Sequence, residues 1–319
     1  MSGRRRAAWG RVPLALATAL CLSEAASAQT GPDIPFAPRT DTSLKDPDNP
    51  SKMFRVDFAR VEHEFPLSRS DLMKITPENL LALSQEEIDQ VYARLTAGGI
   101  PEGQYLGNLF FPRADAGASG DALRPRLEEI LGGVGGRVAG ESIEFVEDIG
   151  RRLWRGKVFE RDRGILRNMI ENPVVLRRLV DDIATVPTTT VPRNGLLGRV
   201  FGTETVWLLF PAKVYCGQSL VDARRESVIV DYTYSDDIPG YRARPDRLAG
   251  RGGLKIRDEI RMIRPGFYLG RAYMNRMFLL NFTLFNEEVA NREGARFSAG
   301  EPVREECWPG EQVRKAAVR

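Results

Sequence analysis

A cluster of Asp258, Arg271 and Tyr273 on one predicted β-hairpin is the strongest candidate for a binding site in this sequence. The dipeptide Pro265-Gly266 favours a tight turn, and a two-residue loop there would place Asp258 opposite Tyr273. Because side chains alternate across a sheet, the three polar residues would share one otherwise mostly apolar face. Asp258 and Arg271 would then be diagonal neighbours, close enough for a charge-assisted hydrogen bond.

Three interpretations of this cluster stay open at the level of sequence. A buried charge must be paired, so an Asp258–Arg271 ion pair could simply fix the register of the strands. The same groups could instead hold the carboxylate or hydroxyl of a ligand at the base of an apolar cavity. Catalysis is the third interpretation, with Asp258 and Tyr273 as base and acid. We carry forward Asp258, Arg271 and Tyr273 as predicted ligand-binding residues.

The two cysteines that follow residue 28, Cys216 and Cys307, are predicted to form a disulfide. Two cysteines in an oxidising compartment are more often paired than free. Cys307 begins the sequence Cys-Trp-Pro-Gly inside a polar C-terminal tail, which is an unusual place for a thiol beside a large aromatic residue. A bridge would attach the tail to the β core, with Trp308 packed beside it. The alternative is two unpaired cysteines, one of them buried in a strand.

Other chemical motifs in the sequence are incomplete. His63 is the single histidine, which excludes the common histidine-rich zinc sites, and we interpret it as an ordinary loop residue. Ser219 has no G-x-S-x-G nucleophile elbow around it. The glycine-rich segment 132–136 lacks the Lys-Ser/Thr ending of a phosphate-binding loop. The sequence therefore predicts no catalytic residue, no metal site and no cofactor.

The first 28 residues have the pattern of a cleaved export signal. Four arginines among the first eleven residues form a positive region, and an apolar run of signal-peptide length follows from Val12 to Leu22. Ala26-Ser27-Ala28 fits the cleavage site. We therefore predict cleavage after Ala28, a periplasmic mature chain, and no membrane-spanning segment after cleavage.

The distribution of charge disfavours nucleic-acid binding. The whole chain has a formal charge of +3, and the signal segment, with its four arginines and Glu24, carries all of that surplus. The mature chain is near neutral, so it has no excess of basic groups to neutralise phosphates. We expect no nucleic-acid partner.

The pattern of secondary structure changes from helical to β along the chain. Ser84 and Glu87 form a capping box that predicts the start of a helix, and Ile88, Val91, Tyr92 and Leu95 follow at helical spacing. The predicted organisation is a signal peptide (1–28), an extended N-terminal lead (29–75), a helical segment (76–100), an antiparallel β-barrel domain (101–290) with helical insertions at about 113–154 and 173–183, and a polar tail (291–319). Strands are expected at 103–111, 154–159, 206–215, 226–234, 254–263, 267–274 and 277–285. About seven strands with short connections are enough to close a small barrel.

Three sequence segments carry a resemblance to known proteins. The segment PEGQYLG (101–107) resembles the glycine–aromatic opening strand of lipocalin-like (calycin-type) barrels, with Tyr105 where lipocalins have tryptophan. The segments RDEIR (257–261) and PGFYLG (265–270) resemble part of an uncharacterised bacterial exported family. The resemblance implies a calycin-type antiparallel barrel, whose members often carry apolar ligands, and it implies no activity. We therefore expect a mainly β fold with helical additions (α+β), a lipocalin-like barrel preceded by short helices.

Three functions from different classes fit these observations. The leading one is a periplasmic binding or carrier protein for a lipid or other hydrophobic small molecule, supported by export, near-neutral charge and many aromatic residues on the predicted strands. The second is an enzyme that acts on such a molecule through Asp258, Tyr273 and Arg271. The third is a non-catalytic envelope scaffold whose barrel is filled by its own side chains.

Overall fold

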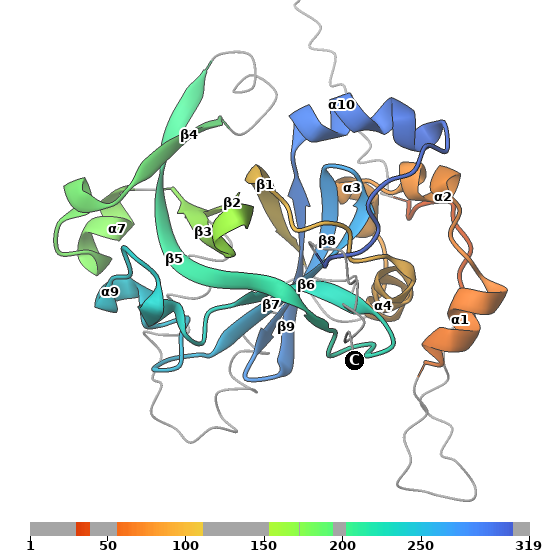
Figure 1. Cartoon of the computed structure of the whole chain (residues 1–319), viewed down its shortest axis with the longest axis horizontal. Helices are drawn as coiled ribbons and strands as arrows, with labels where there is room; N and C mark the ends of the chain where they lie inside the picture. Colours follow the sequence, from red (N-terminus) through yellow and green to blue (C-terminus); the bar gives the residue numbers. More distant parts are fainter. Residues whose placement is uncertain (1–29, 39–55, 111–152, 172, 194–201, 309–319) are drawn as a thin grey trace, which may run out of the picture.

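The computed structural model describes residues 30–38, 56–110, 153–171, 173–193 and 202–308 (Figure 1). The predicted signal peptide, nearly all of the predicted insertion at 113–154 and the end of the tail lie outside these residues. The described residues form nine strands, each antiparallel to its neighbours, and a set of short helices. The strands are β1 (Gly103–Phe110), β2 (Trp154–Glu160), β3 (Ile165–Ile170), β4 (Thr188–Pro192), β5 (Thr203–Gln218), β6 (Glu226–Asp231), β7 (Ile256–Arg264), β8 (Phe267–Met274) and β9 (Met277–Phe285).

Eight of the strands form a closed barrel of up-and-down topology. Leaving β4 aside, each strand pairs with the next one along the chain, and β9 returns to pair with β1. Pairing of β3 with β5 bridges the position of β4 and closes the ring. Closure removes the exposed strand edges that an open sheet would present. The prediction of an antiparallel barrel with helical additions, preceded by short helices, is therefore confirmed.

Both faces of the barrel wall are buried along β8. Every residue of this strand is buried, with Tyr268 and Ala272 in the core that fills the barrel and Phe267 and Leu269 in a second core outside it. Between the two inward residues, Gly270 makes room for the ring of Phe282, because a Cβ added there would lie 2.2 Å from that ring. The sequence of β8 therefore lacks the alternation of apolar and polar residues that a half-exposed strand would show, and its one charged residue, Arg271, is buried.

The second core lies under the helices α2 (Arg69–Lys74), α3 (Pro77–Leu80) and α4 (Gln85–Arg94), and α1 (Phe58–Glu64) packs against α4. As predicted, Ser84 caps α4 and forms a capping box with Glu87. The apolar stripe that includes Ile88 and Val91 packs on the outer face of the barrel wall. Burial of each such side chain stabilises the fold by about 1.5–3 kcal/mol.

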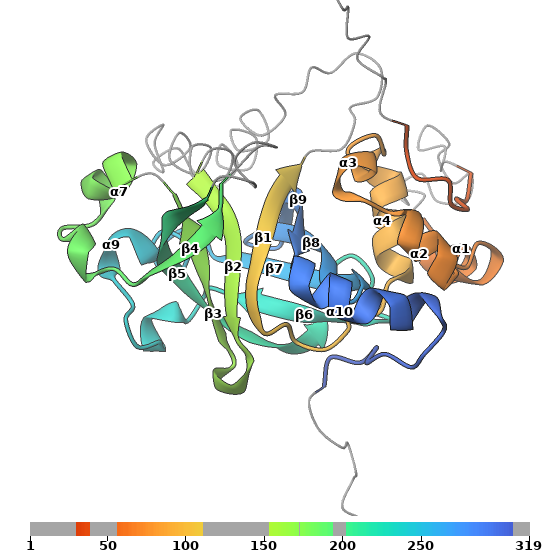
Figure 2. The ribbon, with the colours of Figure 1, turned by 90° about the horizontal axis from the view of Figure 1, so that it is seen from above.

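The beginning of β5 leaves the barrel and forms a two-stranded arm with β4. Residues 203–207 of β5 pair with β4, and β3 takes over as the partner of β5 from Trp207 onward. The arm folds back over the outside of the barrel (Figure 2), where Val191 and Val206 pack on Met169 of β3. As a result β3 is covered on both sides.

Several elements differ from the sequence-based expectation. Strands β3 and β4 were not predicted; β3 is covered on both faces and carries inward-facing Asn168, so its sequence lacks simple alternation. Helices α1 and α2 lie within the range expected to be extended. Helix α10 (Glu287–Ser298) crosses the predicted boundary at residue 290, and Phe297 is its one buried residue, so its apolar periodicity is weak. The helix predicted to open at Pro173 is present as α7 (Pro173–Leu179).

The predicted disulfide between Cys216 and Cys307 is present, with the two Cα atoms 5.7 Å apart. It joins β5 to the segment after α10, and Cys307 is fully buried. The backbone N–H of Cys307 donates a hydrogen bond to Glu226 Oε1 at 2.7 Å. Trp308, which directly follows the bridge, is 46% exposed.

Opening the disulfide should lower stability and leave the barrel folded. The double variant Cys216→Ala/Cys307→Ala removes a link between residues 91 positions apart. On the loop-entropy model the free energy of unfolding should fall by about 4.6 kcal/mol at most. Denaturant titration measures the change, and far-ultraviolet circular dichroism checks the fold. Two titratable thiols in the denatured, unreduced mature protein would contradict the bridge.

Candidate functional site

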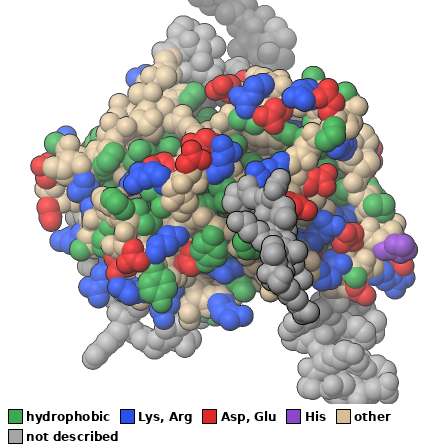
Figure 3. Space-filling view, viewed as in Figure 1, with side chains coloured by type: hydrophobic (Ala, Val, Ile, Leu, Met, Phe, Trp, Pro, Cys, Tyr) green, Lys and Arg blue, Asp and Glu red, His purple; other side chains and the backbone are tan. Residues whose placement is uncertain are grey.

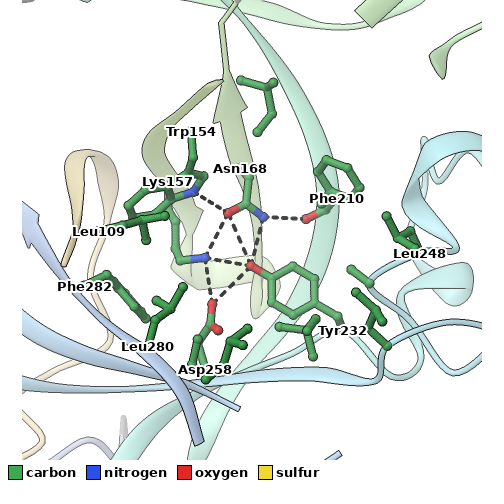
Figure 4. A pocket seen from close by; sticks show the side chains of 16 residues that line it. Leu109, Trp154, Lys157, Asn168, Phe210, Tyr232, Leu248, Asp258, Leu280 and Phe282 are labelled. Atoms are coloured by element: carbon green, nitrogen blue, oxygen red, sulfur yellow. Dashed lines mark hydrogen bonds and ion pairs between the residues drawn. The ribbon is translucent and has the colours of Figure 1, made fainter. Parts of the chain in front are cut away.

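A cavity of about 150 Å³ lies inside the barrel (Figure 4). It is situated where β1 and β3 end and β2, β7 and β9 begin. Twelve of its sixteen lining residues are apolar and four are polar. The apolar lining consists of Leu109, Trp154, Ile170, Phe210, Leu248, Ala249, Leu254, Ile256, Ala272, Leu279, Leu280 and Phe282, and the polar lining of Lys157, Asn168, Tyr232 and Asp258.

An ion pair crosses the barrel interior at this cavity. Lys157 Nζ on β2 lies 2.9 Å from Asp258 Oδ2 on β7, and both side chains are almost completely buried. In the ring of eight strands, β2 and β7 are four strands apart in either direction, so the pair joins opposite walls. Desolvation of two charges is costly, and it is tolerated only where the geometry is good and the remaining polar groups are satisfied.

Asn168 and Tyr232 complete the polar cluster. Lys157 Nζ also donates to Asn168 Oδ1 at 2.9 Å and to the Tyr232 hydroxyl at 2.7 Å. Lys157 and Asn168 are directly paired residues of β2 and β3, so the strand register itself places them together. Trp154 Nε1 donates to the same Asn168 oxygen at 2.9 Å. Each polar group of the cluster therefore has a partner inside the barrel.

The protonation states in the cluster follow from burial and pairing. Burial is the largest single effect and disfavours the ammonium form of Lys157, but the Asp258 carboxylate and the Tyr232 hydroxyl together outweigh it, so the pKa of Lys157 is raised above its usual value. Burial also raises the pKa of the Tyr232 hydroxyl to about 12. At neutral pH the cluster therefore holds a charged lysine and a protonated tyrosine.

A strained residue of β5 is held between the polar cluster and helix α9 (Ala243–Asp246). Phe210, which lines the cavity, has a positive φ of 50°, an uncommon conformation for a side chain of this size. Asn168 Nδ2 donates to its carbonyl oxygen at 3.0 Å, and its N–H donates to Asp246 Oδ1 at 2.8 Å. Asp246 Oδ2 in turn accepts from the N–H of Arg242 at 2.7 Å. Two buried side chains thus fix the bend that turns Phe210 toward the cavity.

The predicted cluster of Asp258, Arg271 and Tyr273 does not form. The turn at Pro265-Gly266 is present, but one extra residue in β7, between Met262 and Arg264, shifts the pairing. Asp258 consequently pairs with Ala272, and Glu259 pairs with Arg271. The N–H of Met262 donates to the carbonyl of Thr96 at 2.9 Å, a contact outside the hairpin that the sequence does not indicate.

Arg271 and Tyr273 therefore lie on the outer face of the barrel, away from Asp258. Arg271 Nε donates to the Tyr273 hydroxyl at 3.0 Å, and its guanidinium forms a short ion pair with Asp89 of α4. These contacts fasten α4 to the barrel wall, and neither residue lines the cavity. Of the three predicted ligand-binding residues, only Asp258 reaches the cavity.

Sequence reasoning missed Lys157, Asn168 and Tyr232. Lys157 within the predicted strand 154–159 was an available signal, because a charge on a buried strand requires a partner. Asn168 had no comparable signal, since β3 itself was not predicted. For Tyr232 the available signal was strand alternation, since it continues the row of Val228 and Val230, which also point into the barrel.

Comparison with known proteins adds no assignment. Searches of protein-family models, curated proteins and solved structures find no match to the chain. Among the described residues, no group of three or more His, Cys, Asp or Glu side chains is arranged to hold a metal ion. Over the same residues, no helix combines the length and the apolar character required to cross a bilayer.

Removing one member of the ion pair should cost far more stability than removing both. Lys157→Met leaves the Asp258 carboxylate buried without its counterion, and the free energy of unfolding should fall by about 3–5 kcal/mol. The double variant Lys157→Met/Asp258→Leu replaces the pair by apolar groups and should recover most of this loss. Denaturant titration of wild type, single variant and double variant measures the effect. Equal destabilisation of the two variants would argue against a coupled pair.

Asp246 should make stability fall as pH rises through the mildly acidic range. Burial raises its pKa from 3.8 to about 6, so the unfolded chain ionises this group more easily than the folded chain does. The stabilisation is complete below about pH 4 and is lost by about pH 6, a change of up to about 3 kcal/mol.

The pH dependence of Asp246→Asn, subtracted from that of wild type, isolates this effect. The difference in unfolding free energy between the two proteins should change with pH between about 4 and 6 and level off on either side. A pH-independent difference for Asp246→Asn would contradict the raised pKa.

Proposed function

We propose that this chain is a periplasmic binding or carrier protein for a hydrophobic small molecule. The observation that carries the proposal is the cavity inside a closed barrel, with twelve apolar lining residues and four polar ones gathered at one side. Ligand sites in proteins are mostly apolar hollows with a few placed polar groups, and small barrels can hold one small ligand.

The volume of the cavity limits the part of the ligand that can be buried. About 150 Å³ corresponds to a cavity that, in an engineered protein used as a reference, takes up benzene. A single ring or a short alkyl segment therefore fits, and a longer lipid would place only one end here. The polar cluster inside the barrel would orient that end.

Export and surface charge support the periplasmic part of the proposal. The first 28 residues have the pattern of a cleaved signal, and a disulfide such as Cys216–Cys307 persists in oxidising compartments. On the face shown in Figure 3, basic and acidic side chains are interspersed, without a large area of one sign. Such a surface does not concentrate strongly charged ligands, which agrees with an uncharged one.

The two other hypotheses receive less support. An enzyme that uses Asp258, Tyr273 and Arg271 together is excluded by their positions on opposite faces of the barrel wall. A scaffold with a filled barrel does not agree with the cavity. We also propose that the chain is related to lipocalin-like proteins, and the eight-stranded up-and-down barrel supports this.

Filling the cavity should abolish ligand uptake. Ala272 lines the cavity, and Ala272→Leu adds branched apolar volume there, at a cost in stability of about 1–3 kcal/mol. Native mass spectrometry of the protein purified from its periplasm should show a bound small molecule on wild type and none on the variant. Ala295→Leu, an equal change at an exposed position of α10, is the control and should retain the molecule. Equal loading of all three proteins would contradict binding in the barrel.

A further inference from the structure

Among the described residues that line the cavity, no side chain offers a free hydrogen-bond donor to a ligand. The ammonium group of Lys157 has three donors, and these are directed to Asp258 Oδ2, Asn168 Oδ1 and the Tyr232 hydroxyl. Trp154, whose indole has a single donor, gives it to Asn168 Oδ1. The donors of the Lys157 ammonium group and of the Trp154 indole are therefore all used in contacts within the protein (Figure 4).

The remaining donors of the cluster are also engaged. Asn168 Nδ2 donates to the carbonyl oxygen of Phe210 at 3.0 Å and to the Tyr232 hydroxyl at 2.9 Å. The Tyr232 hydroxyl has one hydrogen, and two acceptors lie 3.3 Å from it, Asn168 Oδ1 and Asp258 Oδ2. A ligand that requires a donor from the protein would have to break one of these buried hydrogen bonds.

Among the four polar side chains that line the cavity in the described part of the chain, one acceptor atom remains available, Oδ1 of Asp258. Its other carboxylate oxygen, Oδ2, receives Lys157 and Tyr232, whereas no described residue donates to Oδ1 (Figure 4). In the described part of the chain, the polar side-chain atoms that are fully buried without a partner are Arg94 Nη2 and Asn281 Oδ1. Asp258 Oδ1 is not one of these two atoms, so it is not fully buried although it has no partner. Because Asp258 lines the cavity, this oxygen is accessible to a ligand there.

We infer that the ligand of this cavity is a neutral molecule with an apolar body and a hydroxyl group that donates to Asp258 Oδ1. The inference rests on the proposed binding function and specifies its ligand class. An ionised carboxylate only accepts hydrogen bonds, so the group that meets it must be a donor. The volume admits a body of about one ring, which identifies small aromatic or short aliphatic alcohols, or the hydroxyl end of a larger alcohol.

The net charge of the ligand explains why an alcohol should bind better than a carboxylate or an ammonium compound. The Lys157–Asp258 pair is neutral as a unit, so a charged ligand would introduce an uncompensated charge into a buried, mostly apolar space. A carboxylate would in addition place its oxygens against Asp258. An ammonium group satisfies Oδ1 but carries a second positive charge next to Lys157. A hydrocarbon of the same shape fits and leaves Oδ1 without a partner.

Four probes with one ring and one substituent test the inference: benzyl alcohol, toluene, benzylamine and benzoate. Isothermal titration calorimetry of the mature protein at neutral pH should give the tightest binding for benzyl alcohol, roughly tenfold tighter than toluene, since a hydrogen bond to a charged acceptor has about this net value. Benzylamine should bind more weakly than toluene, and benzoate should give no measurable binding.

The double variant Lys157→Met/Asp258→Leu provides the matched control. It removes the acceptor and its counterion together, and circular dichroism verifies that it is folded. The variant should bind toluene at least as well as wild type and should lose the preference for benzyl alcohol. Retention of the tenfold preference in the folded variant would overturn the role of Asp258.

Failure of this inference and failure of the proposed function give different results. Wild type that binds toluene and benzyl alcohol equally, or that prefers benzoate, overturns the alcohol assignment and keeps binding in the barrel. Wild type that binds none of the four probes, and that shows no bound molecule by native mass spectrometry, overturns both. Binding that is unchanged in Ala272→Leu places the probes outside the cavity and also overturns both.

Discussion

The ion pair between Lys157 and Asp258 is the interaction on which the barrel interior depends. It joins two strands that lie on opposite sides of the ring, so it constrains the barrel across its lumen as well as along its wall. Two buried charges are tolerated because they neutralise each other and because Asn168 and Tyr232 accept the two remaining hydrogen bonds of the Lys157 ammonium. Breaking any one of these contacts would leave a buried polar group unpaired. The arrangement therefore fixes one position for β2, β3, β6 and β7 relative to one another.

Strand alternation separates the charged residues of β7 and β8 into two layers with different roles. Asp258 points inward to the cavity, whereas its neighbour Glu259 and the cross-strand Arg271 point outward, beneath α4. Arg261, also fully buried on the outer side, donates to the carbonyl of Tyr92 in α4 and to carbonyls of the segment around β6. The outer layer thus attaches the helices to the barrel. The inner layer is left to define the cavity.

The same residues that define the polar side of the cavity also hold its shape. Asn168 satisfies the Lys157 ammonium through its oxygen and holds the carbonyl of Phe210 through its nitrogen. Asp246 holds the other side of the Phe210 peptide, so the bend in β5 is specified from both directions. Small residues at positions 270 and 272 of β8 keep side-chain volume out of the lumen near Phe282. A preformed hollow loses little conformational freedom when a ligand enters, which favours binding.

The sequence by itself determined the local features: the capped helix that begins after Ser84, most strands of the barrel, the tight turn at Pro265-Gly266, and a disulfide between the two cysteines after residue 28. Each of these follows from propensity, periodicity or residue count within a short stretch of chain or within one pair.

Only the tertiary structure decided which polar residues meet. The N–H of Met262 donates to the carbonyl of Thr96, which lies outside the hairpin. At the same place β7 contains one extra residue, and the resulting shift in register puts Arg271 on the opposite face of the sheet from Asp258. A one-residue shift exchanges the two faces of a strand, so a predicted pair on one strand face depends on contacts that the strand sequence does not contain. The pairing of Lys157 with Asp258 likewise depends on the tertiary structure, because only closure of the ring brings β2 opposite β7.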